Sequence, residues 1–231
     1  MTRTGQVGTR TVIVEDHQLF AEALEIAMTM EGYDVRRLAA PDETVSVARL
    51  VSSVLRHQPR IVLLDLDLGG FGDGVRVINP IARAGANVVV VTAALDQARW
   101  GECVWHGARQ VLPKTRPLNE ILAVVRRLSQ GLTVMDTDER ERLLRAWHSQ
   151  RLVLHRHRER LDRLTPRERQ VLQGLVGGLR VREIADARVV SEATVRTQVK
   201  SILAKLEVSS QIAAVGMARS ARWEPPKETT P

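Results

Sequence analysis

The first half of the chain contains short, uninterrupted runs of apolar residues that are bounded by polar or turn-forming positions. The run Ile61–Leu64 passes directly into Asp65 and is followed by a glycine-rich loop. Runs of this kind predict strands that are buried on both faces of a parallel sheet. We predict five such strands, at residues 10–14, 33–38, 61–64, 87–91 and 109–112.

Between these strands, apolar residues recur at helical spacing, as Phe20, Leu24 and Met28 do. We predict helices at residues 20–30, 41–57, 75–84, 96–106 and 118–128, the second opened by Pro41 and the third shortened or kinked by Pro80. A strand followed by a helix, repeated five times, predicts an α/β fold. It is a doubly wound, five-stranded parallel sheet over residues 9–131, with helices on both faces.

The next segment, residues 136–164, contains no glycine or proline and is dense in charge. Trp147, Leu154 and Leu161 recur in it every seven residues. This pattern predicts a helical linker, placed at residues 132–160. Its apolar positions either form a short coiled-coil seam or pack the helix against its own domains.

Residues 161–222 are predicted to form an all-α domain of four short helices. Thr165 and Glu168 supply the two ends of a capping box, with proline at the first helical position between them. A tight turn before Ser191, between the second and third helices, indicates a helix-turn-helix. Residues 223–231 are predicted to be a disordered tail.

Charge and composition narrow the class of protein. The net charge of +7 is concentrated near the C-terminus, since residues 165–231 hold 11 basic and 7 acidic side chains. This favours a polyanionic partner, although a solvated basic surface would look the same. A single cysteine, Cys103, excludes an intrachain disulfide, and no apolar run reaches the roughly 20 residues of a membrane helix. The first ten residues lack the apolar core of a signal peptide, so we expect a cytoplasmic protein without membrane partners.

Candidate chemistry lies directly after the predicted strands. The residues there are Glu15, Asp16, Asp65, Thr92 and Lys114. The carboxyl ends of parallel strands are where open α/β sheets bind ligands. Carboxylates that meet at such an edge repel one another, and a divalent cation with oxygen ligands, favourably Mg²⁺, relieves the repulsion. A lysine at the rim suits a phosphoryl oxygen, so the set predicts a carboxylate that attacks phosphorus and becomes an acyl phosphate.

These five residues, with EDHQLF after the first strand and LPKT after the fifth, resemble the receiver domain of bacterial response regulators over residues 10–131. The resemblance implies that a sensor histidine kinase phosphorylates Asp65. It implies a Mg²⁺ ion held by Asp16, Asp65 and the backbone carbonyl of Asp67, with Glu15 acting through water, and a phosphate-binding or switch role for Thr92 and Lys114. Such a protein accepts a phosphoryl group and slowly loses it, and is not an enzyme in the usual sense.

The sequence departs from the receiver pattern at several places. Receivers usually have an aromatic residue three positions before the lysine, where this chain has Val111. The route by which phosphorylation changes the output is therefore left open. The segment from Asp16 to Asp65 is a few residues longer than the corresponding segment usually is in this family. Asp67 adds an acid near the phosphoryl group and is expected to change the lifetime of the acyl phosphate.

Another class of protein shares part of the pattern. Asp65-Leu66-Asp67 after an apolar strand also resembles the nucleophile motif of haloacid-dehalogenase-type phosphatases, in which the second aspartate is a general acid and base. That family places the motif on its first strand, whereas two predicted strands precede it here.

The last domain resembles the LuxR-like helix-turn-helix of NarL/FixJ-type regulators over residues 164–215, notably in LTPRE, REIA and ILAKL. The resemblance makes the third helix the recognition helix, which enters the major groove of double-stranded DNA. The predicted DNA-facing residues are Thr194, Arg196, Thr197, Lys200 and Ser201. Gln198 stands where the family often has histidine, and Glu207 and Gln211 replace a usual glycine and arginine.

The sequence therefore predicts a two-domain response regulator in which phosphorylation of Asp65 switches dimerisation and DNA binding, and thereby transcription. The active form is expected to be a homodimer on paired half-sites. The alternative is an atypical receiver that binds DNA without phosphorylation. Val111 supports this alternative, because it stands where receivers usually have an aromatic residue. Trp100 and Trp105 are candidate interface residues.

Overall fold

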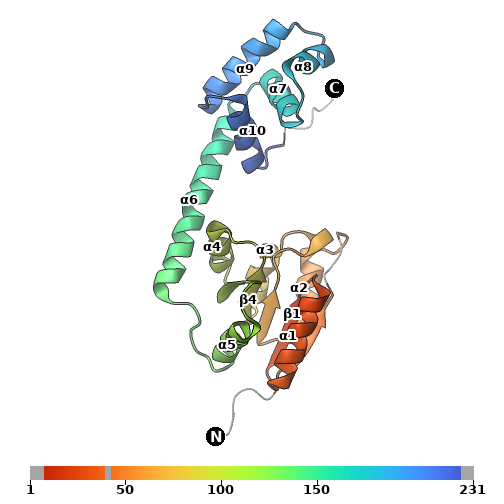
Figure 1. Cartoon of the computed structure of the whole chain (residues 1–231), viewed down its shortest axis with the longest axis vertical. Helices are drawn as coiled ribbons and strands as arrows, with labels where there is room; N and C mark the ends of the chain where they lie inside the picture. The colour runs from red at the N-terminus through yellow and green to blue at the C-terminus, as the bar shows by residue number, and fades with distance from the viewer. Residues whose placement is uncertain (1–7, 40–42, 225–231) are drawn as a thin grey trace. The chain divides into compact units, whose positions relative to one another are not determined.

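The structure is a computed structural model that describes residues 8–39 and 43–224. The chain divides into two compact units, residues 1–148 and 149–231. The division falls inside the long helix α6 (Thr137–Asp162), so each unit contains part of the predicted linker. The units are described separately, and their helices and two of the strands are labelled in Figure 1.

The first unit contains a parallel sheet of the predicted kind. Its strands are β1 (Arg10–Val14), β2 (Asp34–Leu38), β3 (Ile61–Leu64), β4 (Asn87–Thr92) and β5 (Gln110–Pro113). They lie in the order β2-β1-β3-β4-β5, and every neighbouring pair is parallel. This confirms the doubly wound α/β fold, and the strand bounds differ from the predicted ones by one residue at most.

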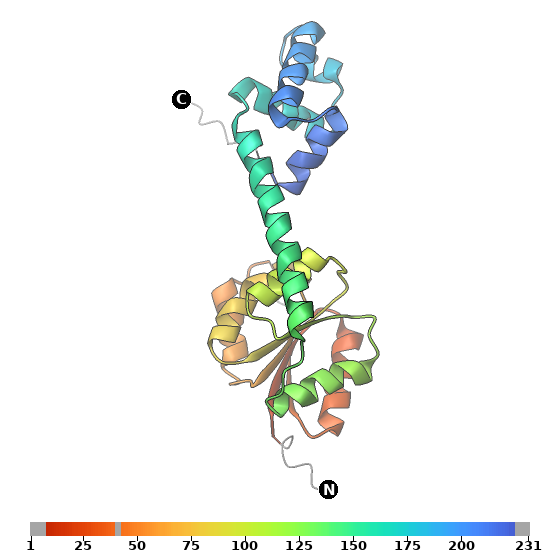
Figure 2. The ribbon, with the colours of Figure 1, turned by 90° about the vertical axis from the view of Figure 1, so that its left-hand side faces the viewer.

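Helices cover both faces of this sheet. They are α1 (Gln18–Met30), α2 (Val47–Leu55), α3 (Val75–Arg83), α4 (Gln97–Trp105) and α5 (Leu118–Ser129), with a short 3₁₀ turn, η1 (Gly69–Phe71), before α3. Helices α1 and α5 lie on one face, and α2, α3 and α4 lie on the other (Figure 2). Alternate strand residues point to opposite faces, so Val62 and Leu64 pack toward α3 while Ile61 and Leu63 pack toward α1 and α5.

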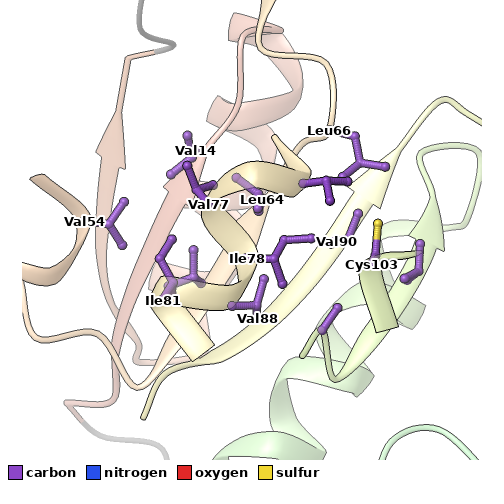
Figure 3. Packing of buried hydrophobic residues seen from close by; sticks show 14 of the residues in the cluster. Val14, Val54, Leu64, Leu66, Val77, Ile78, Ile81, Val88, Val90 and Cys103 are labelled. Atoms are coloured by element: carbon purple, nitrogen blue, oxygen red, sulfur yellow. The ribbon is translucent and has the colours of Figure 1, made fainter. Parts of the chain in front are cut away.

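The core between the sheet and α2, α3 and α4 is shown in Figure 3. Val14, Leu64 and Val90 from neighbouring strands meet Ile78 and Ile81 of α3, and all five are at most 1% exposed. Cys103 of α4 closes the same core, and burial raises the pKa of its thiol to about 12. The one cysteine is therefore a packing residue.

Two helix predictions need correction. The helix predicted to start at Pro41 begins at Val47, because Ser46 caps it by accepting a hydrogen bond from the Arg49 backbone N–H. Pro41 itself lies outside the described residues. Pro80 does not shorten α3 at its own position, since the helix continues to Arg83 with Ile81 fully buried, and the predicted kink stays a prediction.

Helix α6 carries apolar residues that pack within its own two units. Leu143 is 1% exposed and belongs to the core of the first unit. Leu161 is fully buried in the core of the second unit, and Trp147 stacks on Trp105 of α4. Leu143, Trp147 and Leu161 therefore pack as the second alternative predicts, whereas Leu154 is only half-buried, and the coiled-coil seam stays a prediction. Among the helices in the described part of the chain, none combines the length and apolar content needed to cross a bilayer.

The second unit contains four further helices, as predicted. They are α7 (Pro166–Val176), α8 (Val181–Ala187), α9 (Glu192–Leu206) and α10 (Gln211–Ser220). Both hydrogen bonds of the predicted capping box are present at the start of α7, between Thr165 and Glu168. The predicted disordered tail begins too early, because Trp223 packs against the core of this unit and its N–H donates to the Ala218 carbonyl. Residues 225–231 of that tail lie outside the described residues.

Candidate functional site

The strand register brings the predicted strand-end residues to one edge of the sheet. Val14 pairs with Leu64, so Glu15 and Asp65 follow adjacent strands at the same level. Thr92 pairs with Pro113, which places Lys114 one residue further on the neighbouring strand. Residues that are far apart in the sequence therefore meet at the carboxyl edge of β1, β3, β4 and β5.

Lys114 connects two of the carboxylates directly. Its Nζ donates to Oε1 of Glu15 at 2.6 Å and to Oδ2 of Asp65 at 2.8 Å. The Phe20 ring lies on the same ammonium, with its centroid 5.4 Å away. Burial alone would lower the pKa of Lys114, but its hydrogen bonds to Asp65 and Glu15 raise it above the ordinary value. Lys114 is thus a cation fixed between two buried acids.

Asp65 has two oxygens in different surroundings. The residue is 3% exposed, and its Oδ2 is bound to Lys114. Its Oδ1 is also buried, but it has no hydrogen-bond partner among the described residues. A buried carboxylate oxygen without a partner is costly, by about 1–3 kcal/mol, unless the site uses it. Asp65 Oδ1 is therefore the oxygen that can bind a cation or attack an electrophile.

A second group of potential ligands lies beside this pair. Ligand atoms of Glu15, Asp16 and His17 all lie within 4.8 Å of one another. The β3–α3 loop passes close by, because a Cβ added to Gly69 would lie 3.7 Å from Oδ2 of Asp16. His17 was not among the predicted site residues. Its position directly after two acids at a strand end was the only sequence signal for it.

Thr92 lies at the same edge, but its side chain bonds to the loop after β4 and not to the carboxylates. It is 2% exposed, and its Oγ1 accepts a hydrogen bond from the Ala94 backbone N–H at 3.1 Å. Its own hydroxyl proton is not used in that contact, so the side chain can still donate. Val111, three positions before Lys114, is 2% exposed and packs in the core on the α3 side of the sheet.

The loop after Asp65 has a constraint that sequence reasoning missed. A Cβ on Gly74 would collide with the Asp65 backbone carbonyl and lie 3.1 Å from the Cα of Leu66, so only glycine fits there. Its N–H donates to the Leu66 carbonyl at 2.8 Å. Asp67 forms a backbone bridge to Asp73 across the same loop, and the Asp67 side chain is exposed. The run of glycines signalled a loop, but not this close approach.

The second unit presents the predicted recognition helix. Thr194, Arg196, Thr197 and Lys200 are exposed on α9, while Val195 and Val199 on the same helix are buried. Thr197 bonds back to the Ala193 carbonyl, and Arg196 pairs with Glu192 at 3.1 Å. The exposed polar face of α9 therefore has the composition that base edges and phosphates require.

Ser201 differs from the other four predicted DNA-facing residues. Its side chain is half-buried, and its Oγ donates to Oε1 of Glu168 at 2.6 Å. A DNA contact by this hydroxyl stays a prediction, and the contact that the structure gives it is with α7.

Glu168 is a buried acid whose wider role the sequence did not reveal. Besides Ser201, it accepts from Lys205 Nζ at 2.7 Å and from the Thr165 backbone N–H at 2.7 Å. Burial alone would raise its pKa, but these hydrogen bonds, led by that of Lys205, hold the pKa at about 2. Glu168 thereby ties α9 to the start of α7. The sequence motif indicated only the capping box.

The structure shows the contacts of two residues, Glu207 and Gln198, that depart from the LuxR-like pattern. Glu207 ends α9 with a φ of 56°, a left-handed conformation that glycine adopts without strain. Its side chain pairs with Arg160 at 2.5 Å and with Arg163 at 3.6 Å. Gln198 lies 3.5 Å from an Arg188 nitrogen that donates to it. Both replacements are accommodated without loss of the fold.

Comparison with known proteins agrees with this arrangement. Residues 11–126 match the response regulator receiver domain family, and residues 162–218 match the luxR family of bacterial regulatory proteins. The first match covers half of the chain. The chain belongs to the response regulator family, as a transcriptional regulator with a receiver domain and a luxR-type DNA-binding domain.

Curated relatives share the full two-domain length. A nitrate/nitrite response regulator protein homolog of Haemophilus influenzae is 25% identical over 209 residues, which cover 89% of this chain and 93% of that protein. The transcriptional regulatory protein DesR of Bacillus subtilis is 24% identical over 211 residues, covering 91% and 96%. A solved structure of RcsB from Salmonella enterica serovar Typhimurium, bound to a promoter in the presence of the phosphomimetic BeF3−, is 22% identical. It has a TM-score of 0.50, and the match covers 92% of this chain and 98% of that one.

Proposed function

We propose that Asp65 accepts a phosphoryl group from a sensor histidine kinase, and that this phosphorylation controls dimerisation and DNA binding by the second unit. The proposal depends most on one observation. Lys114 binds one oxygen of Asp65, while the other oxygen is buried and has no partner among residues 8–39 and 43–224. We assign residues 9–131 to the receiver, 132–160 to the linker and 161–222 to the DNA-binding domain. We expect the protein to act in the cytoplasm.

The residues at this edge fit a Mg²⁺ ion. The Oδ1 of Asp65, which has no partner among the described residues, and the carboxylates of Glu15 and Asp16 supply hard oxygen ligands and excess negative charge. The ligands would be Asp16, Asp65 and the backbone carbonyl of Asp67, with Glu15 acting through water. When bound, the ion would neutralise charge on the oxygens of the transferring phosphoryl group.

The side chains of the site suit the transfer itself. One Asp65 oxygen forms a bond to phosphorus while the phosphorus–nitrogen bond of the donor phosphohistidine breaks, and the imidazole leaves. Lys114 remains charged because its pKa is raised, so its ammonium can pair with a phosphoryl oxygen. Thr92 accepts from Ala94 and keeps its own proton available for a second phosphoryl oxygen.

The second unit would read DNA through α9. Thr194, Arg196, Thr197 and Lys200 are exposed together on that helix, and Ser201 lies at the margin of the same face. A phosphorylated homodimer would present two such helices to paired half-sites in double-stranded DNA. The solved RcsB structures of similar fold include one of two RcsB dimers bound to two parallel DNAs. That description is consistent with the proposal.

The test uses the purified full chain. It is incubated with Mg²⁺ and a small phosphodonor such as phosphoramidate, and intact mass is used to count the phosphoryl groups retained per chain. We expect one, none in Asp65→Asn, and one in the matched variant Asp67→Asn. The lifetime of the acyl phosphate should differ in Asp67→Asn, and equal dephosphorylation rates would remove the predicted effect of Asp67.

DNA binding is then measured on an operator selected by the chain from a random duplex library. Phosphorylation should raise the affinity and shift the protein from monomer to dimer in sedimentation. Equal affinity with and without full phosphorylation would instead favour the atypical receiver, the second candidate, because Val111 is a buried core residue where receivers usually have an aromatic switch residue. The phosphatase alternative is not retained, because the chain belongs to the receiver family.

A further inference from the structure

An imidazole stands directly beside the acidic edge of the sheet. The Nδ1 atom of His17 lies 3.5 Å from Oδ1 of Asp16. In the part of the chain that the structure describes, Glu15, Asp16 and His17 are the only group of three or more potential metal ligands whose ligand atoms lie this close together. The proposed function uses the two acids and gives His17 no role.

The backbone holds His17 in this position, whereas its side chain takes no part in the core. The His17 N–H donates to Oε1 of Glu15 at 2.9 Å, and the His17 carbonyl accepts from the Ala21 N–H at 3.0 Å where α1 begins. The imidazole itself is 77% exposed. Packing therefore does not require a histidine here, and the reason for one lies in what the exposed ring can bind.

A buried oxygen at the same edge points independently to a cation. Oδ1 of Asp65 is buried and has no hydrogen-bond partner among the described residues. Glu15 connects this carboxylate to His17, because its Oε1 accepts both from the His17 N–H and from Lys114, which also binds Asp65. The imidazole, the Asp16 carboxylate and the unsatisfied Asp65 oxygen thus surround one end of the β1–β3 pair.

The space beside Asp16 is bordered by a residue without a side chain. A Cβ built on Gly69 would lie 3.7 Å from Oδ2 of Asp16. The φ of Gly69 is 56°, a conformation that favours glycine, so a larger residue is disfavoured at this position. The loop after β3 thereby leaves room for an ion next to the Asp16 carboxylate.

The charge of the edge matches one divalent cation. Glu15, Asp16 and Asp65 contribute three negative charges, and Lys114 offsets one of them through its two hydrogen bonds. The remaining two negative charges equal the charge of a single divalent ion. His17 supplies a ligand without adding to this charge, because a neutral imidazole nitrogen binds metals.

The nitrogen ligand and its spacing favour one class of ion. Mg²⁺ takes oxygen ligands in an octahedron at about 2.0–2.1 Å, which places adjacent ligands about 2.9 Å apart. Zn²⁺ accepts imidazole in a tetrahedral site with bonds of about 2.0–2.1 Å, which places adjacent ligands about 3.4 Å apart. The 3.5 Å between His17 Nδ1 and Asp16 Oδ1 agrees with the second spacing.

We propose that His17, with Asp16 and Oδ1 of Asp65, binds a first-row transition ion of the Zn²⁺ or Co²⁺ class in place of Mg²⁺. The inference rests on the metal site of the proposed function, to which it adds a nitrogen ligand and a second class of ion. Imidazole suits these ions, whereas Mg²⁺ prefers carboxylate, carbonyl and water oxygens. The two classes of ion therefore compete for the same carboxylates, and His17 sets the outcome.

Metal titration of the untagged, metal-free full chain tests the assignment. Zn²⁺ and Mg²⁺ affinities are measured by calorimetry, and Co²⁺ is followed by its visible absorption, which is strong for a tetrahedral ion and weak for an octahedral one. We expect His17→Gln to weaken Zn²⁺ binding at least about tenfold and to abolish the strong Co²⁺ absorption, because a metal–nitrogen bond is lost. The Mg²⁺ affinity should change less than about twofold, since its ligands are oxygens.

His155→Gln is the matched control. His155 lies 3.4 Å from Glu159 on α6, so it has the same kind of carboxylate neighbour without the acidic edge, and its loss should leave the first site unchanged. Equal Zn²⁺ affinity in the native chain and His17→Gln would overturn the proposal. An equal loss of Zn²⁺ and Mg²⁺ affinity would overturn it as well, because His17 would then shape the site without selecting the ion.

The phosphorylation assay keeps this inference separate from the proposed function. A chain that binds Zn²⁺ through His17 but retains no phosphoryl group would overturn the proposed function and leave the His17 ligand in place. A chain that is phosphorylated on Asp65 but whose Zn²⁺ affinity does not depend on His17 would give the reverse result.

Discussion

Each unit of this protein buries a carboxylate against a lysine, and the two arrangements differ in how fully the carboxylate is satisfied. Glu168 accepts from Lys205, Ser201 and the Thr165 backbone, so both of its oxygens are occupied. Asp65 is also buried, yet within the described part of the chain only its Oδ2 has a partner, Lys114.

The difference separates a structural acid from a reactive one. A buried charge with complete hydrogen bonding stabilises the fold, because removing it leaves its partners unpaired. A buried carboxylate with one unpaired oxygen carries an unfavourable desolvation free energy, which is offset only when that oxygen binds a ligand or reacts. The same residue chemistry thus holds α9 in one unit and provides a phosphoryl acceptor in the other.

The largest expected effect is that of Asp65→Asn. Phosphoryl incorporation should fall to none, because an amide does not attack phosphorus. The free energy of unfolding should stay within about 1 kcal/mol of the native value, since Glu15 keeps Lys114 paired and no complete network is lost. Intact mass after treatment with a phosphodonor and urea unfolding monitored by circular dichroism measure the two quantities. A loss of several kcal/mol would mean that Asp65 is structural after all.

The opposite result is expected for Glu168→Gln, which should leave phosphorylation intact. The amide oxygen can still accept from Lys205 and from the Thr165 N–H, but it carries no charge to strengthen these bonds, so the second unit should lose about 2 kcal/mol of stability. Amide exchange in α7 and α9 reports this loss within the full chain. Glu183→Gln is a useful control, because Glu183 accepts only the Arg180 backbone N–H at an exposed position. If both variants changed amide exchange in α7 and α9 equally, the hydrogen bonds of Glu168 would not be what holds α9 against α7.

The pH dependence of the stability of the native chain gives a second test of the contribution of Glu168. The folded-state pKa of Glu168 is about 2, below its ordinary value of 4.5. The unfolded state therefore binds more protons between these values, and stability falls as the pH falls. The contribution of Glu168 should be complete above about pH 4.5 and disappear toward pH 2, so the native chain and Glu168→Gln should converge there.

Much of the fold follows from the sequence because its signals are local. The run Ile61–Leu64 predicts a buried strand by itself, and strand order then places Asp65 and Lys114 at one edge. Capping at Thr165 could be predicted for the same reason, since its partner is three residues away.

The remaining features depend on contacts between distant positions. A Cβ on Gly101 would collide with the Leu143 backbone carbonyl, and nothing near Gly101 in the sequence indicates this approach. The link from Glu168 to Lys205 spans 37 residues. Helix α2 was predicted six residues too early because Pro41 is a common helix start, whereas the cap that forms is that of Ser46. Sequence patterns identify elements and motifs more readily than the pairs that tertiary packing creates.

A smaller effect is expected for Lys200→Ala on the exposed face of α9. If Lys200 binds a DNA phosphate, its loss should reduce the slope of log affinity against log salt by about one unit. The slope is obtained from binding titrations at several salt concentrations on the selected operator. Arg83→Ala, which removes an exposed charge from α3 in the first unit, serves as the control. An unchanged slope in Lys200→Ala would place this lysine outside the phosphate contacts.

The smallest expected effect concerns the end of α9, next to the Glu168 clamp. Glu207 is left-handed there and also pairs with Arg160, so backbone strain and ion pairing oppose each other. Glu207→Ala removes the pair and keeps the strain, while Glu207→Gly removes both. The Glu207→Gly variant should therefore be more stable than Glu207→Ala by about 0.5–1 kcal/mol. This difference is the backbone strain that glycine relieves, minus the larger conformational entropy that glycine loses on folding. Thermal unfolding of both variants measures the difference. Equal stabilities would mean that α9 ends without strain, and that the glycine usual in this family is not required by the backbone here.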